Sequence, residues 1–236
     1  MKQENDKSVG LNQRIPFSVL NAGMLTFLET NQVNRDELLG LMLEETKGEN
    51  RAKKASAFAS KIIEMENPVI DGIKKHFTPQ SWARLSEREK KVLLLSLTCL
   101  RYPIVYDSLQ ILGTQFKIQS SVNRAFINQK LSLKYGSNRT CMVGIDALIP
   151  MIIESTLVER IKTGLYGKGD LVIPQHQFVK EAWTKMELIL SKTRTISVEE
   201  LSHRAIISFV DISNITKNEP YILTVSQDQP SNLWVG

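Results

Sequence analysis

Hydrophobic residues return every three or four positions along the first half of the chain, which is the spacing of one face of an α-helix. The strongest such segment is VLLLSLTCL, which is apolar on nearly every face and follows a capping box formed by Ser86 and Glu89. A helix of this kind is surrounded by other helices. We therefore expect it to be the core of an N-terminal helical bundle over residues 15–103.

Helix signals continue on both sides of this segment. Asn34 and Glu37 form a capping box ahead of DELLGLMLEE, and Thr78 followed by Pro79 marks another helix start. In ENRAKKASAFASKIIEM the apolar residues cluster on one side, and the side away from them carries Lys53, Lys54 and Lys61. These lysines are candidates for phosphate binding, although amphipathic helices commonly place lysines in solvent.

The pattern changes in the second half of the chain. Ser120 or Ser121 is placed to cap a helix over VNRAFINQKLSLKY, which ends at Gly136, and a second helix follows over NRTCMVGIDALIPMIIE. Next, LVERIKTGLYGKGDLVIP has β-favouring residues on both sides of a glycine-containing turn, as in a β-hairpin. Two helices, a tight turn and a hairpin predict a winged helix-turn-helix over residues 104–175.

In such a unit the second helix lies in the major groove with its first residues toward the bases. Helical spacing predicts a core side made of Cys141, Met142, Ile145, Leu148, Ile149 and Ile152. The opposite side is a polar start followed by small residues, namely Arg139, Thr140, Val143 and Ala147. Pro150 lies inside this helix and is expected to end or kink it. The same arrangement also occurs as a structural or protein-docking module, so both interpretations stay open.

The charge distribution favours a polyanionic partner. The net charge is +5, and the middle of the chain is its basic part: residues 50–101 carry 11 basic and 5 acidic groups, and residues 102–175 carry 8 and 5. The candidate DNA contacts are the basic and polar side chains of the winged unit and the lysines of the earlier helix, namely Lys117, Arg124, Lys134, Asn138, Arg139, Thr140, Arg160, Lys162, Lys168, Lys53, Lys54 and Lys61.

The flanking segments are predicted from their polarity and caps. Residues 1–14 are polar and expected to be disordered. HQFVKEAWTKMELIL begins a pair of C-terminal helices over residues 176–212, and a capping box of Ser197 and Glu200 starts the second of them. Residues 213–236 are predicted to be an extended or disordered tail, in which only YILTV is a possible strand.

Composition and targeting signals indicate a cytoplasmic protein without a membrane partner. The first residues lack the apolar core of a signal peptide, and no apolar run approaches the ~20 residues that cross a bilayer. Cys99 and Cys141 both lie in apolar helical patterns, so we expect them to be buried thiols in a reducing compartment.

No enzyme class is supported by the sequence. His76, His176 and His203 are far apart, and none has a Cys or a second His at metal-ligand spacing. The glycine-rich LYGKGDL lacks the Walker spacing of a phosphate-binding loop. We therefore expect no metal, no cofactor and no catalytic activity.

Four segments carry a family resemblance: FSVLNAG near the start, ENRAKKASAFASKII, the apolar helix before Arg101-Tyr102-Pro103, and GSNRT together with LVERIKTGLY. Over roughly residues 15–175 they resemble BrxA, a small protein of the BREX phage-defence systems. The resemblance implies a mostly helical fold with a bundle similar to the Nus B antitermination factor, DNA binding, and a non-enzymatic role beside other defence proteins. The chain is longer at its C-terminus, so the resemblance implies no role for residues 176–236.

The leading functional hypothesis is a non-enzymatic accessory protein of a bacterial phage-defence system that binds DNA, with duplex DNA favoured over RNA. One alternative is a protein–protein scaffold or adaptor subunit. Another is a sequence-specific transcriptional repressor, which would strongly prefer one operator over random DNA.

Overall fold

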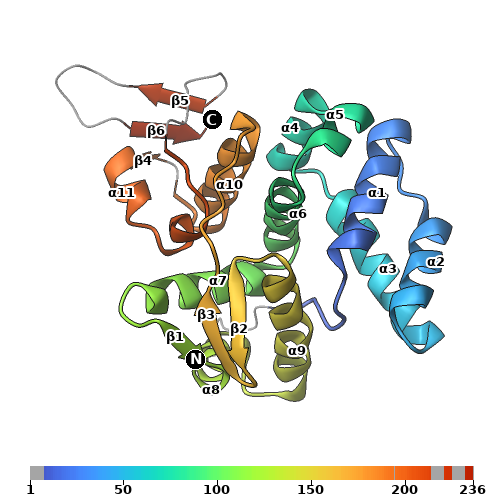
Figure 1. Ribbon diagram of the computed structural model, residues 1–236, viewed down its shortest axis with the longest axis horizontal. Coiled ribbons are helices and arrows are strands. Elements are labelled where there is room, and N and C mark those ends of the chain that lie inside the picture. The colour runs from blue at the N-terminus through green and yellow to red at the C-terminus, as the bar shows by residue number, and fades with distance from the viewer. Residues whose placement is uncertain (1–7, 194, 214–220, 225–231, 236) are drawn as a thin grey trace, which may run out of the picture.

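The computed structural model describes residues 8–193, 195–213, 221–224 and 232–235. Over these residues the chain is mainly helical with two small antiparallel sheets (Figure 1). The helices are α1 (Phe17–Thr30), α2 (Arg35–Glu45), α3 (Glu49–Ile63), α4 (Pro68–His76), α5 (Pro79–Arg84), α6 (Glu87–Arg101), α7 (Pro103–Phe116), α8 (Arg124–Tyr135), α9 (Arg139–Glu154), α10 (Gln177–Leu190), α11 (Val198–Ser202) and the 3-10 helix η1 (Ala205–Phe209). The strands are β1 (Ser121–Asn123), β2 (Val158–Lys162), β3 (Leu165–Lys168), β4 (Thr195–Ser197), β5 (Tyr221–Thr224) and β6 (Asn232–Val235).

The hydrophobic core is centred on α6. Every residue from Val92 to Cys99 is buried, and α1, α3, α4, α7 and α10 all pack against this helix (Figure 1). Its predicted capping box is present, because Glu89 N donates to Ser86 Oγ (3.3 Å) and Ser86 N donates to the Glu89 carboxylate (3.1 Å). The prediction of a central apolar helix is confirmed.

The caps of the surrounding helices follow the sequence signals. The Asn34 side chain accepts a hydrogen bond from Glu37 N (3.2 Å), but the Glu37 carboxylate accepts from the Thr26 hydroxyl (2.9 Å). The second half of that predicted capping box is therefore replaced by a contact between α1 and α2. Thr78 caps α5 with Pro79 at its first position, as predicted.

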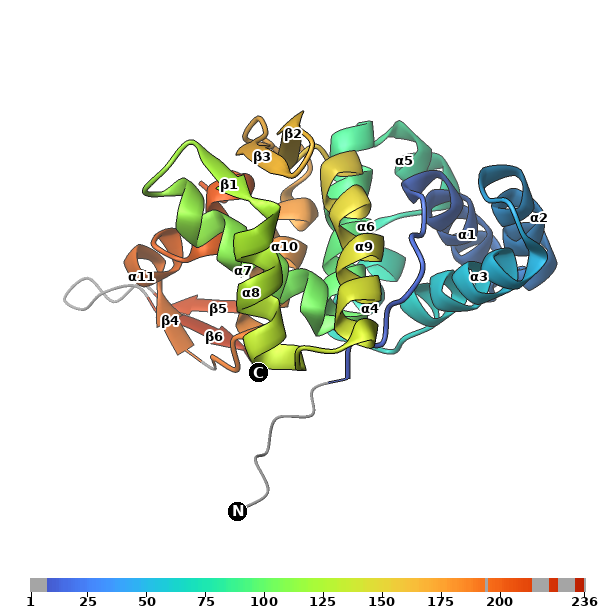
Figure 2. The ribbon, with the colours of Figure 1, turned by 90° about the horizontal axis from the view of Figure 1, so that it is seen from below.

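Residues 8–16 form an ordered strap along α9, seen in dark blue beside that helix in Figure 2. Val9 and Leu11 are buried, and a Cβ placed on Gly144 would lie 2.3 Å from Val9 Cγ1. The strap ends where Arg14 and the backbone N–H of α1 both bond to Glu154 (2.8 and 2.9 Å). Residues 8–14, which were expected to be disordered, are instead held against the fold by two buried apolar side chains and an ion pair.

The helix α10 belongs to the same core as the N-terminal helices. It packs on α6 and α4, and the fully buried Trp183 donates from its indole nitrogen to Ile206 O (3.2 Å). The Phe178 ring lies against Gly72, where a Cβ would be 2.3 Å from the ring. One continuous hydrophobic core thus joins residues on both sides of the boundary expected at 175.

A second small sheet lies beside α10 and α11. Its strands run in the order β4-β6-β5, and both pairings are antiparallel. The strand predicted from YILTV is β5, and residues 214–220, 225–231 and 236 of the expected tail lie outside the described residues. An isolated parallel bridge pairs Val172, in the segment after β3, with Val210, which follows η1.

Candidate nucleic-acid interface

The segment from α7 to β3 contains the three helices α7, α8 and α9 and the three-stranded sheet β1-β3-β2, grouped in the lower part of Figure 1. β3 pairs antiparallel with both of its neighbours. The predicted hairpin is confirmed, with Thr163 and Gly164 between its strands and Gly164 at φ 74°. The turn is tied to the start of α8, because Arg124 N donates to Gly164 O (2.8 Å).

The start of α8 differs from the sequence prediction. A helix capped by Ser120 or Ser121 was expected, but residues 121–123 form β1, and the Asn123 side chain caps α8 by accepting from Ala125 N (2.8 Å). The buried Val122 pairs with Tyr166 of β3. The start of α8 is set by the pairing of β1 with a hairpin about 40 residues later. A local capping signal carries no information on such a distant pairing.

The second predicted helix is present as α9, which starts at Arg139, one residue after the expected start at Asn138. Gly136 adopts φ 85°, and Asn138 caps the helix by accepting from Cys141 N (2.9 Å). Asn138 is one of the candidate DNA contacts, and its side-chain oxygen therefore already accepts a hydrogen bond within the fold. Arg139 and Thr140 are exposed in the first turn. Pro150 does not end the helix, which continues to Glu154.

The exposed side of α9 is rotated from the predicted one. Ala147, expected at the surface, is 5% exposed, whereas Met142, expected in the core, is 37% exposed. The strap accounts for the burial of Ala147, because it packs on Gly144 and bonds to Glu154, and Ala147 lies between these positions on the helix circumference. The side left to solvent carries Arg139, Met142, Val143, Asp146 and Pro150.

Several candidate cations already have hydrogen-bond or ion-pair partners within the fold. Lys117 donates to the backbone oxygen of His203, and Arg124 forms an ion pair with Asp146 of α9. Lys134 pairs with the buried Asp107 of α7, which also accepts from Tyr135 Oη (2.6 Å). These three side chains hold α7, α8, α9 and the segment before η1 together, so they are less available to phosphate than the sequence suggested.

Other candidates have no hydrogen bond or ion pair within the described part of the chain. Among the cations between α7 and β3 these are Arg139, Arg160, Lys162 and Lys168, all exposed. Lys162 lies next to the hairpin turn and Lys168 at the far end of β3, opposite Val158. On α3, Lys54 and Lys61 are exposed and without such contacts, while Lys53 pairs with Glu49.

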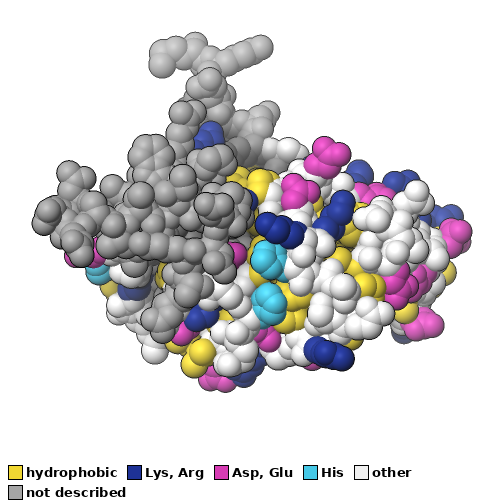
Figure 3. Space-filling model, turned by 90° about the horizontal axis from the view of Figure 1, so that it is seen from above, with side chains coloured by type: hydrophobic (Ala, Val, Ile, Leu, Met, Phe, Trp, Pro, Cys, Tyr) yellow, Lys and Arg dark blue, Asp and Glu magenta, His cyan; other side chains and the backbone are white. Residues whose placement is uncertain are grey.

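Two histidines that are far apart in sequence meet at the surface. The ring centroids of His76, at the end of α4, and His176, before α10, are 6.4 Å apart. Figure 3 shows histidine side chains, in cyan, side by side on one face of the molecule. His176 Nδ1 caps α10 by accepting from Phe178 N (3.2 Å). Within the described residues no group of three His, Cys, Asp or Glu side chains is placed to hold a metal ion.

The His176 cap predicts a pH dependence of stability. Burial and the neighbouring His76 lower the pKa of His176, and Glu89 opposes this shift. Protonation also removes the Nδ1 acceptor. This contribution is complete above the unfolded-state pKa of about 6.5 and is lost as the pH falls through the folded-state pKa. We expect the melting temperature to fall between pH 7.5 and 5.5, and to fall less in His176→Asn, which keeps a capping oxygen but does not titrate. Equal losses in both proteins would contradict this assignment.

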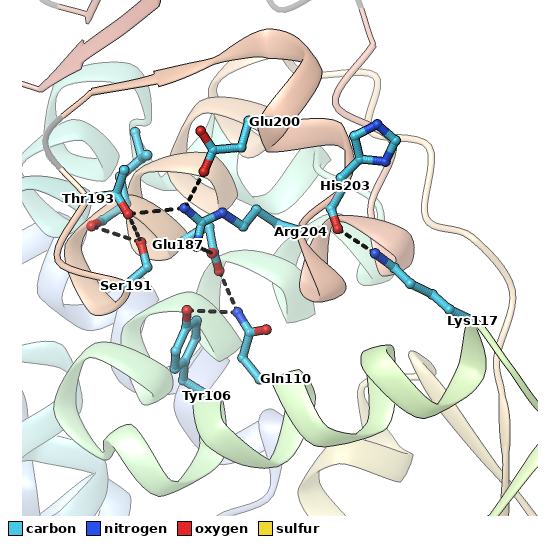
Figure 4. Close-up of polar contacts among 10 residues, drawn as sticks. Tyr106, Gln110, Lys117, Glu187, Ser191, Thr193, Glu200, His203 and Arg204 are labelled. Carbon is cyan, nitrogen blue, oxygen red and sulfur yellow. Dashed lines mark hydrogen bonds and ion pairs between the residues drawn. The ribbon is translucent and has the colours of Figure 1, made fainter.

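A buried polar network joins α7 to the C-terminal helices (Figure 4). The Glu187 side chain of α10 is fully buried and accepts from Gln110 Nε2 (2.9 Å), which also donates to Tyr106 Oη (2.7 Å). An Arg204 nitrogen lies 3.9 Å from the other Glu187 oxygen. Burial raises the pKa of Glu187, while Tyr106, Arg204 and Gln110 oppose the rise. Because Asp107 on the same helix anchors α8, α7 positions both the C-terminal helices and α8.

Comparison with protein-family models, with curated proteins and with solved structures finds no match for this chain. Among the helices of the described residues no single one is long and apolar enough to span a membrane. α6 and α7 reach that length and composition only as a pair, across a bend of 115°.

Proposed function

We propose that this chain is a non-catalytic protein that binds duplex DNA through the segment α7–β3, acting as a winged helix-turn-helix. The element order α7, β1, α8, α9, β2, β3 and the sheet order β1-β3-β2 support this proposal. In this arrangement α9 enters the major groove with Arg139 leading, and the hairpin lies along the phosphate backbone.

The observation that carries the proposal is the distribution of free cations. Arg139, Arg160, Lys162 and Lys168 lie at the start of α9 and on the hairpin, exposed and without a partner within the described residues. A lysine or arginine that needs no internal partner binds phosphate without first breaking an ion pair. Phosphate contacts dominate affinity and carry no sequence information, so binding to random duplex DNA is expected.

The wider biological role is proposed from the resemblance to BrxA. In this role the protein is a cytoplasmic accessory of a bacterial phage-defence system, its helices α1–α6 form a Nus B-like bundle, and other defence proteins are its partners. Duplex DNA is preferred to RNA because the exposed side of α9 suits the wide major groove of B-DNA, whereas the major groove of an RNA helix is narrow.

A gel shift at low salt tests the proposal. Micromolar protein is expected to shift a random-sequence DNA duplex and to shift an RNA duplex of the same length less. No shift of the DNA duplex at this concentration would reject the proposed function. Binding confined to one operator, with weak binding to random DNA, would instead identify a sequence-specific repressor.

A protein–protein scaffold is the second candidate, and exposed apolar side chains favour it. Leu133 on α8 is 72% exposed, and Ile118 after α7 is 76% exposed. Single exposed aliphatic residues are common on soluble proteins, so this observation is weaker than the grouping of free cations. A chain that shifts no nucleic acid but forms a stable complex with a defence-system protein would support the scaffold.

A further inference from the structure

The side chains on the solvent-exposed side of α9 are unusual for a helix that enters a DNA groove. Arg139 is exposed and unpaired within the described residues, Met142 is 37% exposed, and Val143 is half-buried. Met142 and Val143 follow Arg139 by three and four positions, so they lie one turn further along the same side of the helix. One cation and two apolar groups therefore face the surface that the proposed function presents to bases.

Two polar neighbours of these three residues already have partners within the fold. Asn138 uses its side-chain oxygen to cap α9, and Asp146 forms an ion pair with Arg124 of α8. Thr140 is exposed but lies about 100° around the helix from Arg139. Base recognition by α9 is thus left mainly to one guanidinium group and two hydrophobic side chains.

The chemistry of base edges then limits what this surface can recognise. An arginine forms its best paired hydrogen bonds with O6 and N7 of guanine, and apolar side chains favour the C5 methyl group of thymine. Methionine and valine cannot satisfy the amino group of cytosine or adenine, and covering such a donor without a hydrogen bond is unfavourable. One helical turn advances about 5.4 Å, which is between one and two base-pair steps of about 3.4 Å.

We propose that α9 reads a guanine and a neighbouring thymine in the major groove, with Arg139 on the guanine and Met142 and Val143 on the thymine methyl group. This inference rests on the proposed DNA binding. It adds a modest preference for G–T steps to an affinity that comes mainly from phosphate contacts.

Replacing thymine with uracil tests the inference, because this change removes only the methyl groups. Fluorescence anisotropy is measured with a short duplex containing several G–T steps, and with the same duplex containing uracil. The wild-type protein is expected to bind the uracil duplex about threefold to fivefold more weakly. This factor corresponds to the free energy of burying about one methyl group. The salt dependence is expected to be the same for both duplexes, since the phosphate contacts are unchanged.

Variants separate methyl recognition from general effects of uracil on the duplex. Met142→Ala combined with Val143→Ala is expected to bind the thymine duplex as weakly as the uracil duplex. Leu133→Ala removes an exposed apolar side chain on α8 and is expected to keep the full difference. Arg139→Ala is expected to lose the effect of replacing guanine with 7-deazaguanine, which lacks the N7 acceptor.

Equal affinity of the wild-type protein for both duplexes would overturn this inference and leave the proposed function intact. A difference that persists in the Met142→Ala, Val143→Ala protein would overturn it as well, because the methyl groups would then act through duplex shape. Failure to bind either duplex would reject the proposed function itself.

Discussion

Replacing Arg160, Lys162 and Lys168 together with alanine is expected to cause the largest loss of DNA binding of any surface change in this protein. Each side chain is exposed and without a partner within the described residues, so the variant is expected to fold normally. Each lost phosphate contact lowers the salt slope by roughly one unit and lowers the affinity about tenfold near 0.1 M salt. Affinity measured across a salt series gives both quantities.

The matched control is a second triple substitution on α3, in which Lys53, Lys54 and Lys61 become alanine. These lysines are also exposed, and they matter only if DNA crosses the N-terminal helices. The slope and affinity of this variant are expected to stay close to those of the wild-type protein. The opposite result, with binding abolished by the α3 substitutions and kept by the hairpin substitutions, would place the binding surface on the helical bundle.

The sequence identified these cations but gave no means of ranking them. Arg124 and Lys134 looked equivalent to Lys162 and Lys168, since all four lie in the same basic stretch. Arg124 and Lys134 differ from the other two because each pairs with an acidic side chain. The partners are Asp146 of α9 and Asp107 of α7, each more than 20 positions away. Pairing over such separations depends on the packing of α8, which the charge pattern does not contain.

Local signals were reliable where no distant segment competed with them, and they failed where one did, as at the start of α8 and in the capping box of α2. The capping box of Ser86 and Glu89 and the hairpin around Gly164 are local signals, and both are present. The exposed side of α9 was misjudged because a strap more than 130 residues earlier covers Gly144. Helical spacing alone left Met142 and Ala147 on the wrong sides.

The meeting of His76 and His176 is a further case of this limit. The two histidines are 100 positions apart, and only the packing of α10 on α4 and α6 brings them together. Glu89 was predicted to take part in the capping box of α6, and it does. Its second role, in holding the segment before α10, depends on the tertiary structure.

Glu89→Ala is expected to destabilise the protein by about 2–4 kcal/mol, because it leaves buried backbone donors without an acceptor. Glu89 is 5% exposed, and its carboxylate accepts from Gln175 N (2.9 Å), His176 N (2.8 Å) and Ser86 N (3.1 Å). The first two bonds hold the chain where it passes from the segment after β3 into α10. Urea denaturation monitored by tryptophan fluorescence measures the change in unfolding free energy.

Glu87→Ala is the control, since Glu87 occupies the same first turn of α6 but pairs with Lys90 from an exposed position. Its expected cost is below about 1 kcal/mol, which covers the ion pair and the helix dipole.

Burial raises the pKa of Glu89, but the bonds from His176, Ser86 and Gln175 outweigh it and lower the pKa below 4.5. The stabilisation is therefore complete above pH 4.5 and is lost as the pH falls through the folded-state pKa. The wild-type and Glu89→Ala proteins should thus converge in stability at low pH, and equal costs for both alanine variants at pH 7 would show that the Glu89 bonds do not hold this junction.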